Sequence, residues 1–533
     1  MNRLLLVNGR IRSFDPQWPD QTALLCENGR VSFLGDDFDA RALYRQGDEV
    51  IDLEGKSVLP AFHDAHTHFY HFAITLRRLR LEDAHSEHTA LEAVRGLAER
   101  AAPGEWIVGR GWSLQRWQTT EWPTRGQLDE VAPNHPVALA AKDGHTWWVN
   151  SVALQQAGIS RATTDPKGGV IERDASGEPT GILREQAIEL IKPHIASPPE
   201  RTVLGGLRDA TDQFHTLGIA SADILSGSMG KDLELEEAFR LLQKQDRAGM
   251  LGVRLTLWFA AQDLDRLIGL GLRSGFGGDW LRFGGIKLYA DGSLGSGTAA
   301  MLEPYVGSAS KGMEVLTAPE MAAIVKKAAE NGIACAIHAI GDRAVRNALD
   351  AFEGAKAATA ANGLRQRIEH AQCISEQDIP RFGQLGVIAS VQPCQLMGDV
   401  ETAERLWGPE RSKRTFPLMS LLKAGAALAF GTDVPVEPPD PRRSLKGAVL
   451  RPKDDGSPWT PGECIAPWDA FLAYTRGSAW AAGLDHLQGS IAPGRRADLV
   501  VFNEDPIDCG PARMADALVV LTIVDGKVVY RKR

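Results

Sequence analysis

The sequence lacks the marks of several protein classes. No apolar run approaches the roughly 18 residues that span a bilayer. Only four consecutive apolar residues, 4–7, precede Asn8, which is too few for the core of a signal peptide. The net charge is −9 and no long run of Lys or Arg occurs, which argues against a nucleic-acid partner. We therefore expect a cytoplasmic protein with a small-molecule substrate and no membrane partner. The composition is compatible with a homo-oligomer.

Cysteine is sparse as well. The six cysteines are scattered and form no Cys-x-x-Cys pair, so neither a structural zinc cage nor a disulfide framework is expected. The apolar fraction of 44% and the charged fraction of 24% are those of an ordinary globular protein. A chain of 533 residues is long enough for one large domain with attachments, or for roughly two or three domains.

Both ends of the chain consist of short apolar runs separated by turn signals. Asn8-Gly9 and Asn28-Gly29 lie between such runs near the N-terminus, and Asp525-Gly526 lies between two near the C-terminus. Neither end has enough strands to bury a sheet face by itself. We therefore expect residues 1–57 and 485–533 to pair into one small β-sandwich, with the rest of the chain inserted between them.

Between the two ends, apolar β-rich runs alternate with helical patterns, as in a parallel α/β fold. Eight such runs are present, which is the strand count of a TIM barrel. We predict an α/β protein in which residues 58–484 form a (β/α)8 barrel. The expected strands are 58–62, 219–224, 253–259, 281–288, 333–338, 366–371, 387–392 and 427–432.

The stretch between the first two expected strands is far longer than one helix requires, so residues 72–205 are expected to form an inserted subdomain. This stretch is rich in tryptophan. Large aromatics can line a substrate pocket, but they also build small cores. The candidates for substrate contact here are Trp112, Asp143 and His145.

A barrel places its chemistry at the carboxyl ends of its strands, and several of these ends carry groups that can bind a metal. His66 and His68 are two residues apart, so in an extended segment both point to one face. Each candidate also has an ordinary explanation, such as a surface lysine, a hydrogen-bonded core histidine or a helix cap. Together they favour a metal centre. The set is His66, His68, Lys287, His338, His370 and Asp433.

In these residues and their order, the sequence resembles the amidohydrolase superfamily. That barrel has His-x-His after strand one, a lysine on strand four, single histidines after strands five and six, and an aspartate after strand eight. Residues 489–501 resemble the closing β segment of the family. Residues 287–298 and 143–145 resemble the branch of YtcJ-like proteins and N-substituted formamide deformylases.

The resemblance implies a divalent metal, most simply zinc, with one or two ions per chain. Our hypothesis is that His66, His68 and Asp433 hold one ion and that His338 and His370 hold the other. Lys287, an ammonium as encoded, would bridge the two after carboxylation to a carbamate. Burial favours this modification because it disfavours the charged amine.

The implied reaction is hydrolysis of a C–N bond other than a peptide bond, in an amide or formamide, by a metal-bound hydroxide. Asp433 would accept the proton of the water and deliver it to the leaving amine. Asp291, in the glycine-rich loop 291–297, would orient Lys287 or contact substrate. A hydrolase of cyclic amides or esters, or a non-catalytic scaffold relative, remains an alternative.

The sequence departs from that branch at one point. The branch often has a histidine two residues after the Gln-Pro pair of strand seven, whereas here Gln392-Pro393 is followed by Cys394-Gln395. The substrate preference of relatives therefore does not transfer directly to this chain.

Overall fold

The computed structural model describes residues 3–532 except 118, 120, 143–145, 167–168, 196–197, 227–232 and 454. The chain divides into two compact units. The first combines Met1–Tyr70 with Thr211–Arg533, and the second is His71–Ala210. The predicted substrate contacts Asp143 and His145 lie outside the described residues.

The first unit contains one sheet of eight parallel strands, arranged in the order in which they occur in the sequence. The last strand approaches the first, where the Asp433 N–H donates to the His66 carbonyl at 2.8 Å and the His68 N–H donates to the Val434 carbonyl at 2.8 Å. The predicted eight-stranded parallel barrel is therefore confirmed. Its strands are β7 (Phe62–Thr67), β14 (Ile219–Leu225), β15 (Arg254–Ala260), β16 (Leu281–Tyr289), β17 (Ala334–Ala339), β18 (Arg367–His370), β19 (Ile388–Val391) and β20 (Leu428–Phe430).

The prediction for the first barrel strand was wrong in its bounds. Residues 58–62 belong to two strands, because β6 (Ser57–Pro60) pairs in another sheet and β7 begins only at Phe62. The Ala61 N–H donates to Asp498, whereas the Phe62 N–H donates to Gly218 in the barrel. The chain thus changes sheets at Ala61 within one continuous apolar run, which hydrophobicity cannot reveal.

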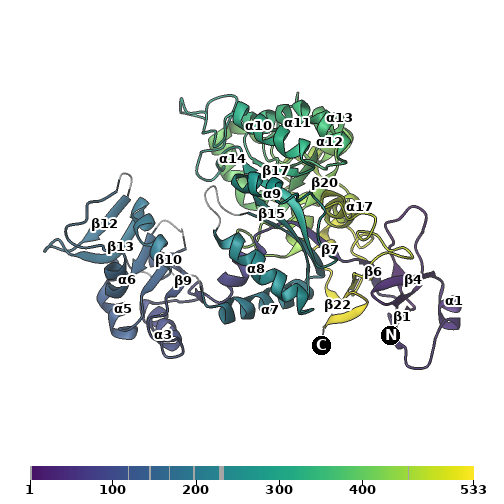
Figure 1. Ribbon diagram of the computed structural model, residues 1–533, viewed down its shortest axis with the longest axis horizontal. Coiled ribbons are helices and arrows are strands. Elements are labelled where there is room, and N and C mark those ends of the chain that lie inside the picture. Colours follow the sequence, from purple (N-terminus) through teal and green to yellow (C-terminus); the bar gives the residue numbers. More distant parts are fainter. Residues whose placement is uncertain are drawn as a thin grey trace. The chain divides into compact units, whose positions relative to one another are not determined.

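Helices connect the barrel strands, and Figure 1 shows α10, α11 and α12 outside the sheet. Local signals explain their ends. Thr317 and Glu320 form a capping box at the start of α10, and α13 ends at Gly386 with φ of 67°. The helices of this part are α7 (Glu200–Thr216), α8 (Leu233–Arg247), α9 (Leu264–Gly269), α10 (Ala318–Glu330), α11 (Asp342–Gly354), α12 (Lys356–Ala361), α13 (Ile379–Leu385), α14 (Leu396–Ser412), α15 (Leu418–Lys423), α16 (Pro441–Val449), α17 (Pro467–Leu472) and α18 (Ser478–Ala481).

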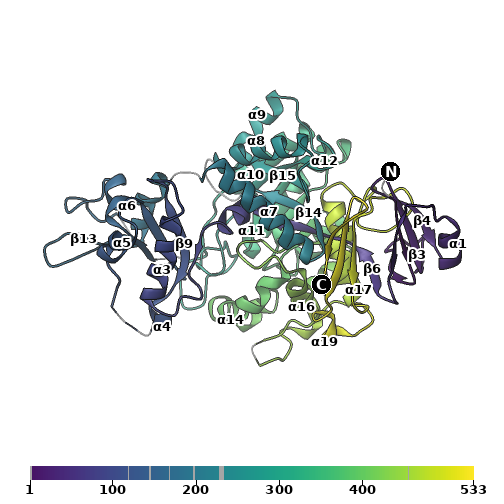
Figure 2. The same ribbon diagram turned by 90° about the horizontal axis from the view of Figure 1, so that it is seen from below.

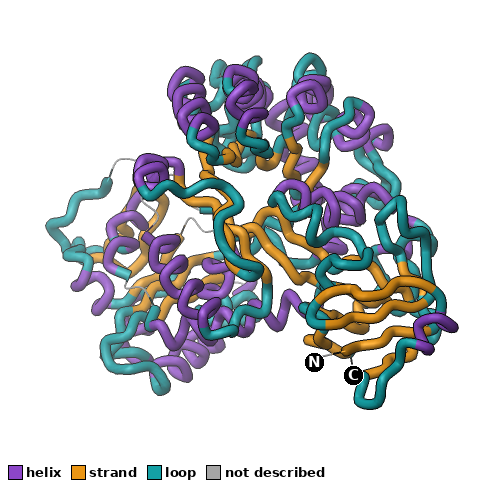
Figure 3. Tube along the Cα trace, turned by 45° about the vertical axis from the view of Figure 1, so that its right-hand side comes forward, coloured by secondary structure: helices purple, strands orange, loops and turns teal. Residues whose placement is uncertain are grey.

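Strands from both ends of the chain lie side by side in the first unit (Figures 2 and 3). One sheet has the order β4-β3-β1-β5 and the other has the order β2-β6-β21-β22-β23. Leu4 and Leu24 of the first sheet share one buried cluster with Val58, Leu499 and Ile523 of the second, so the two sheets pack face to face. The strands are β1 (Arg3–Val7), β2 (Arg10–Ile11), β3 (Ala23–Glu27), β4 (Arg30–Gly35), β5 (Glu49–Asp52), β21 (Leu499–Phe502), β22 (Val519–Val524) and β23 (Lys527–Arg531).

The second unit has its own sheet and core. Its described strands pair in the order β12-β13-β11-β10-β9-β8, with α3 (Glu87–Ala98), α5 (Arg125–Val131) and α6 (Ser151–Gln156) packed in the same unit. The strands are β8 (Leu79–Arg80), β9 (Ile107–Trp112), β10 (Val137–Ala141), β11 (Thr146–Val149), β12 (Gly169–Arg173) and β13 (Pro179–Glu185).

Trp112 is a core residue of this second unit. It is 1% exposed, its indole N–H donates to the Leu139 carbonyl at 2.8 Å, and its ring stacks on that of Trp117 at 5.5 Å between centroids. The predicted contact between Trp112 and substrate does not fit this position, because no face of the ring is accessible.

Among the described residues, none of the helices combines the length and apolar character required to cross a membrane.

Candidate functional site

Three of the predicted ligands converge where the barrel closes. His66 lies in β7, His68 follows that strand, and Asp433 follows β20. The Asp433 Oδ1 atom lies 3.5 Å from His66 Nε2 and 3.1 Å from His68 Nε2. One ligand atom from each residue lies within 4.8 Å of the others, which is the arrangement needed to hold one cation.

The two remaining histidines continue this group along the ends of β17 and β18. The ring of His370 lies 5.0 Å from that of His66 and 4.6 Å from that of His338, measured between centroids. His338 Nε2 lies 2.9 Å from the Gly292 carbonyl, which leaves Nδ1 as the ring atom with a lone pair. The four histidines therefore form a row from β7 to β17.

Two buried atoms of the predicted ligands have no hydrogen-bond partner among the described residues. They are His370 Nδ1 and Asp433 Oδ1, and the latter is close to His68 without the geometry of a hydrogen bond. Buried polar atoms nearly always have partners. Both residues also have left-handed backbones, with φ of 66° and 62°, a conformation uncommon outside glycine that is found at functional sites. Bound cations would satisfy these two atoms, so the residues fit a metal centre.

Burial determines the protonation of these groups. It lowers the pKa of His338 to about 3, with a further contribution from the positive charge of Lys287, and it also lowers the pKa values of His66 and His370. Burial alone would raise the pKa of Asp433, but the neighbouring His66 and His68 outweigh it and hold that pKa below its usual range. Neutral imidazoles and an ionised carboxylate are the forms that bind a divalent metal.

Lys287 lies in β16 with its ammonium 5.0 Å from the ring centre of Tyr289. Its side chain is 2% exposed, and burial lowers its pKa to about 8. All six predicted ligands line a single cavity of about 470 Å3 within the first unit. The structure thus brings together the whole set predicted from the strand ends.

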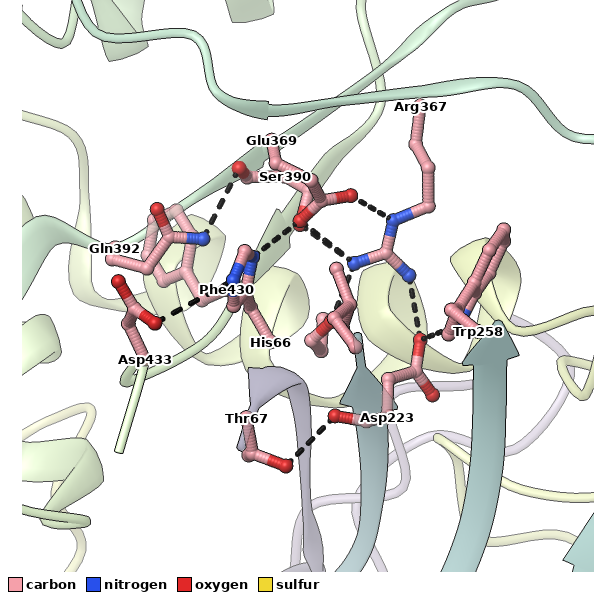
Figure 4. A network of polar contacts seen from close by, with 12 residues as sticks. His66, Thr67, Asp223, Trp258, Arg367, Glu369, Ser390, Gln392, Phe430 and Asp433 are labelled. Atoms are coloured by element: carbon pink, nitrogen blue, oxygen red, sulfur yellow. Dashed lines mark hydrogen bonds and ion pairs between the residues drawn. The ribbon is translucent and has the colours of Figure 1, made fainter. Parts of the chain in front are cut away.

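A charged network behind His66 was missed by the sequence reasoning (Figure 4). His66 Nδ1 donates to Glu369 Oε2 at 2.6 Å, which leaves Nε2 directed toward Asp433. Arg367 contacts Glu369 on one side and Asp223 on the other, the latter at 2.6 Å. His63 Nε2, which lies 2.9 Å from Asp223 Oδ1, is therefore part of this support and not a ligand.

The alternation of charge in Arg-Ile-Glu-His, residues 367–370, could have indicated this network. Two opposite charges on one face of a short strand inside a barrel must pair within the interior. Arg367 and Glu369 are both 0% exposed, and the charge of Arg367 holds the pKa of Glu369 below its usual range against the effect of burial. The sequence offered no indication of which histidine Glu369 contacts.

Asp291 is held by the backbone of neighbouring loops. Its carboxylate accepts hydrogen bonds from the N–H groups of Ala300, Ile340 and Gly341 at 2.8–3.0 Å. It is 1% exposed and does not line the cavity. The suggested contact with substrate therefore does not fit, because both carboxylate oxygens are occupied in fixing the loops beside His338.

The departure at residues 394–395 places an amide beside the candidate catalytic carboxylate. Gln395 Nε2 donates to Asp433 Oδ2 at 2.9 Å. Cys394 is buried, its thiol contacts the Thr432 carbonyl, and it does not line the cavity. Gln395 is thus the residue of this pair that can affect chemistry at Asp433.

Comparison with known proteins gives consistent results. The sequence model of the amidohydrolase family matches residues 49–530. The chain is 34% identical to the protein LONG AFTER FAR-RED 3 of Arabidopsis thaliana, over 99% of this chain and 91% of that protein. It is 30% identical to the N-substituted formamide deformylase of Arthrobacter pascens, over 100% of this chain and 99% of that enzyme. An uncharacterized metal-dependent hydrolase of Pyrococcus horikoshii superimposes with a TM-score of 0.80 at 30% identity, over 96% of this chain and 99% of that one. The family inferred from the ligand motif is therefore confirmed, as is the branch inferred from residues 287–298 and 143–145.

Replacing Arg367 by Met tests the buried network. Asp223 and Glu369 would be left buried without their cation, so we expect the free energy of unfolding to fall by about 3–5 kcal/mol. Urea unfolding followed by tryptophan fluorescence measures this change. The exposed pair Arg95–Glu92 provides the control, since Arg95→Met should change stability by less than about 1 kcal/mol. Equal effects of the two substitutions would contradict the assignment.

Proposed function

The chain belongs to the amidohydrolase family, and we propose that within this family it is a metal-dependent hydrolase that cleaves the C–N bond of a small amide or formamide. The observation that carries the proposal is the convergence of four histidines, Lys287 and Asp433 on one cavity. The names of the formamide deformylase and of the metal-dependent hydrolase among its relatives support the reaction type and the need for a metal.

The residues divide into two candidate ligand groups. His66, His68 and Asp433 would hold one divalent cation, and His338 with His370 would hold a second. Imidazole nitrogens and a carboxylate oxygen are donors that suit zinc. When bound, such a cation lowers the pKa of a water molecule and polarises the carbonyl group of the substrate.

Lys287 would link the two groups only after modification. An ammonium group has no lone pair to offer a cation. Because burial lowers its pKa to about 8, a fraction of Lys287 is the neutral amine at neutral pH, and an amine can add carbon dioxide to form a carbamate. A carbamate on Lys287 would offer two oxygen donors to cations held by the two ligand groups, all of which line the same cavity.

Asp433 is the proposed proton carrier. Oδ2 is held by the Gln395 amide at 2.9 Å, while Oδ1 faces the cavity without a hydrogen-bond partner among the described residues. Because its pKa is held low by the histidines, the carboxylate is ionised and able to accept a proton from water. The same oxygen can return this proton to the departing amine.

An assay of zinc-loaded protein tests the proposal directly. N-substituted formamides, N-acyl amino acids, lactams and simple esters would be compared at equal concentration. We expect turnover of the linear amides or formamides above all others. Preferential turnover of lactams or esters, or no turnover in any class, would overturn the proposal.

Replacing Asp433 by Asn tests its role as proton carrier. The substitution keeps the shape of the side chain but removes the base, so kcat should fall by about 10²–10⁴-fold while the circular dichroism spectrum stays unchanged. Asp350→Asn, at an exposed position paired with Arg381, is the control and should retain kcat. Near-native turnover in Asp433→Asn would refute the role.

Glu369→Gln tests whether the buried carboxylate tunes the His66 ligand. Without the negative charge that accepts from His66 Nδ1, zinc affinity should fall by about 10–100-fold. Competition with a chromogenic chelator measures the affinity, and Glu353→Gln at an exposed position provides the matched control. Native protein that binds no zinc, or a Glu369→Gln variant with native affinity, would contradict this role.

A further inference from the structure

The cavity is lined by two carboxylates besides Asp433. Asp399, in the first turn of α14, and Glu437, after β20, both line the cavity. Among the described residues that line it, Lys287 is the only cationic side chain apart from the histidines. The cavity of about 470 Å3 is large enough for a small organic substrate beyond the reacting carbonyl group.

Asp399 and Glu437 differ in their partners. Glu437 forms an ion pair with Arg443 at 2.8 Å, so its charge is already balanced. Asp399 accepts a hydrogen bond from Gln372 Nε2 at 2.7 Å, and no cation of the described chain lies within ion-pair distance of it. Asp399 is thus a half-buried carboxylate that has no counterion among the described residues.

Without a counterion, the ionised form of Asp399 is disfavoured in the protein that has no substrate bound. Burial, with a smaller contribution from the charge of Glu437, raises the pKa of Asp399 to about 7, although the Gln372 amide opposes this change. The ionised form of a carboxylate in such an environment is stabilised when a ligand supplies the missing positive charge. The helix N-terminus at Asp399 lessens the cost but does not supply a full charge.

Asp399 lies one helical turn from the residue that contacts Asp433. Gln395, whose amide holds Asp433, immediately precedes α14, and Asp399 follows it by four residues in a helical backbone. Side chains four residues apart in a helix lie on one face, with Cβ atoms about 5–6 Å apart. A substrate that places its carbonyl group near Asp433 can therefore reach Asp399 with its substituent.

We propose that Asp399 forms a subsite for a cationic group, so that the preferred substrates are amides or formamides whose nitrogen substituent ends in a protonated amine. The inference rests on the proposed hydrolase function and adds the substrate class. Asp399 binds the ammonium group, Gln372 orients the carboxylate, and Glu437 is held in its own ion pair and contributes little.

Two isosteric formamides test the subsite. N-formylputrescine ends in an ammonium group where N-pentylformamide ends in a methyl group. For the native zinc-loaded protein we expect kcat/KM to favour N-formylputrescine by at least about tenfold, chiefly through KM. Asp399→Asn keeps an acceptor for Gln372 but removes the charge, and should abolish the preference while the rate with N-pentylformamide stays within about threefold. Glu437→Gln is the matched control and should retain the preference.

A binding measurement separates this inference from the proposed reaction. Isothermal titration calorimetry of both formamides with the Asp433→Asn protein requires no turnover. Tighter binding of N-formylputrescine, lost on adding Asp399→Asn, would support the subsite even if the native protein hydrolysed neither compound. Equal binding of the two formamides, no binding of N-formylputrescine, or a preference that survives Asp399→Asn would overturn the subsite, whatever the outcome for hydrolysis.

Discussion

The arrangement of the site depends on one buried guanidinium. Arg367 lies inside the barrel between Glu369 and Asp223, and through Glu369 it fixes which nitrogen of His66 carries the proton. Without this cation, two carboxylates would share the buried interior of the barrel, where unpaired charge is strongly disfavoured. The network costs desolvation energy, and it orients a side chain that faces the candidate metal centre, which an apolar core of equal volume could not do.

Similar supports hold the rest of the site. Asp291 fixes the backbone beside His338 through three N–H groups, and Gln395 leaves one oxygen of Asp433 directed into the cavity. Closure of the barrel between β7 and β20 brings His66 next to Asp433 through the backbone itself. The groups proposed to perform chemistry are therefore held in place by neighbours that take no part in the reaction. This support matters because small displacements of reacting groups lower the reaction rate strongly.

Much of the first unit could be predicted, because the signals are local and periodic. Alternating strand and helix patterns indicated the barrel, and the rule that barrel chemistry lies at strand ends identified His338 and His370 although each resembles a core histidine. The prediction was wrong where local signals are ambiguous. Residues 58–62 form one apolar run divided between two sheets, and Trp112 faces a core although its sequence context is equally compatible with a pocket.

By itself the sequence determined the fold class, the six ligand-capable side chains and the family motif, because spacing and residue type are local properties that folding preserves. Only the tertiary structure decided which groups these side chains contact. Glu369 meets His66 across 303 residues, and Asp291 turns toward backbone amides. In the part of the chain that the structure describes, Glu437 has a counterion and Asp399 has none. These outcomes depend on distances between side chains from separate strands and loops, and those distances are set by packing of the whole barrel and not by separation along the chain.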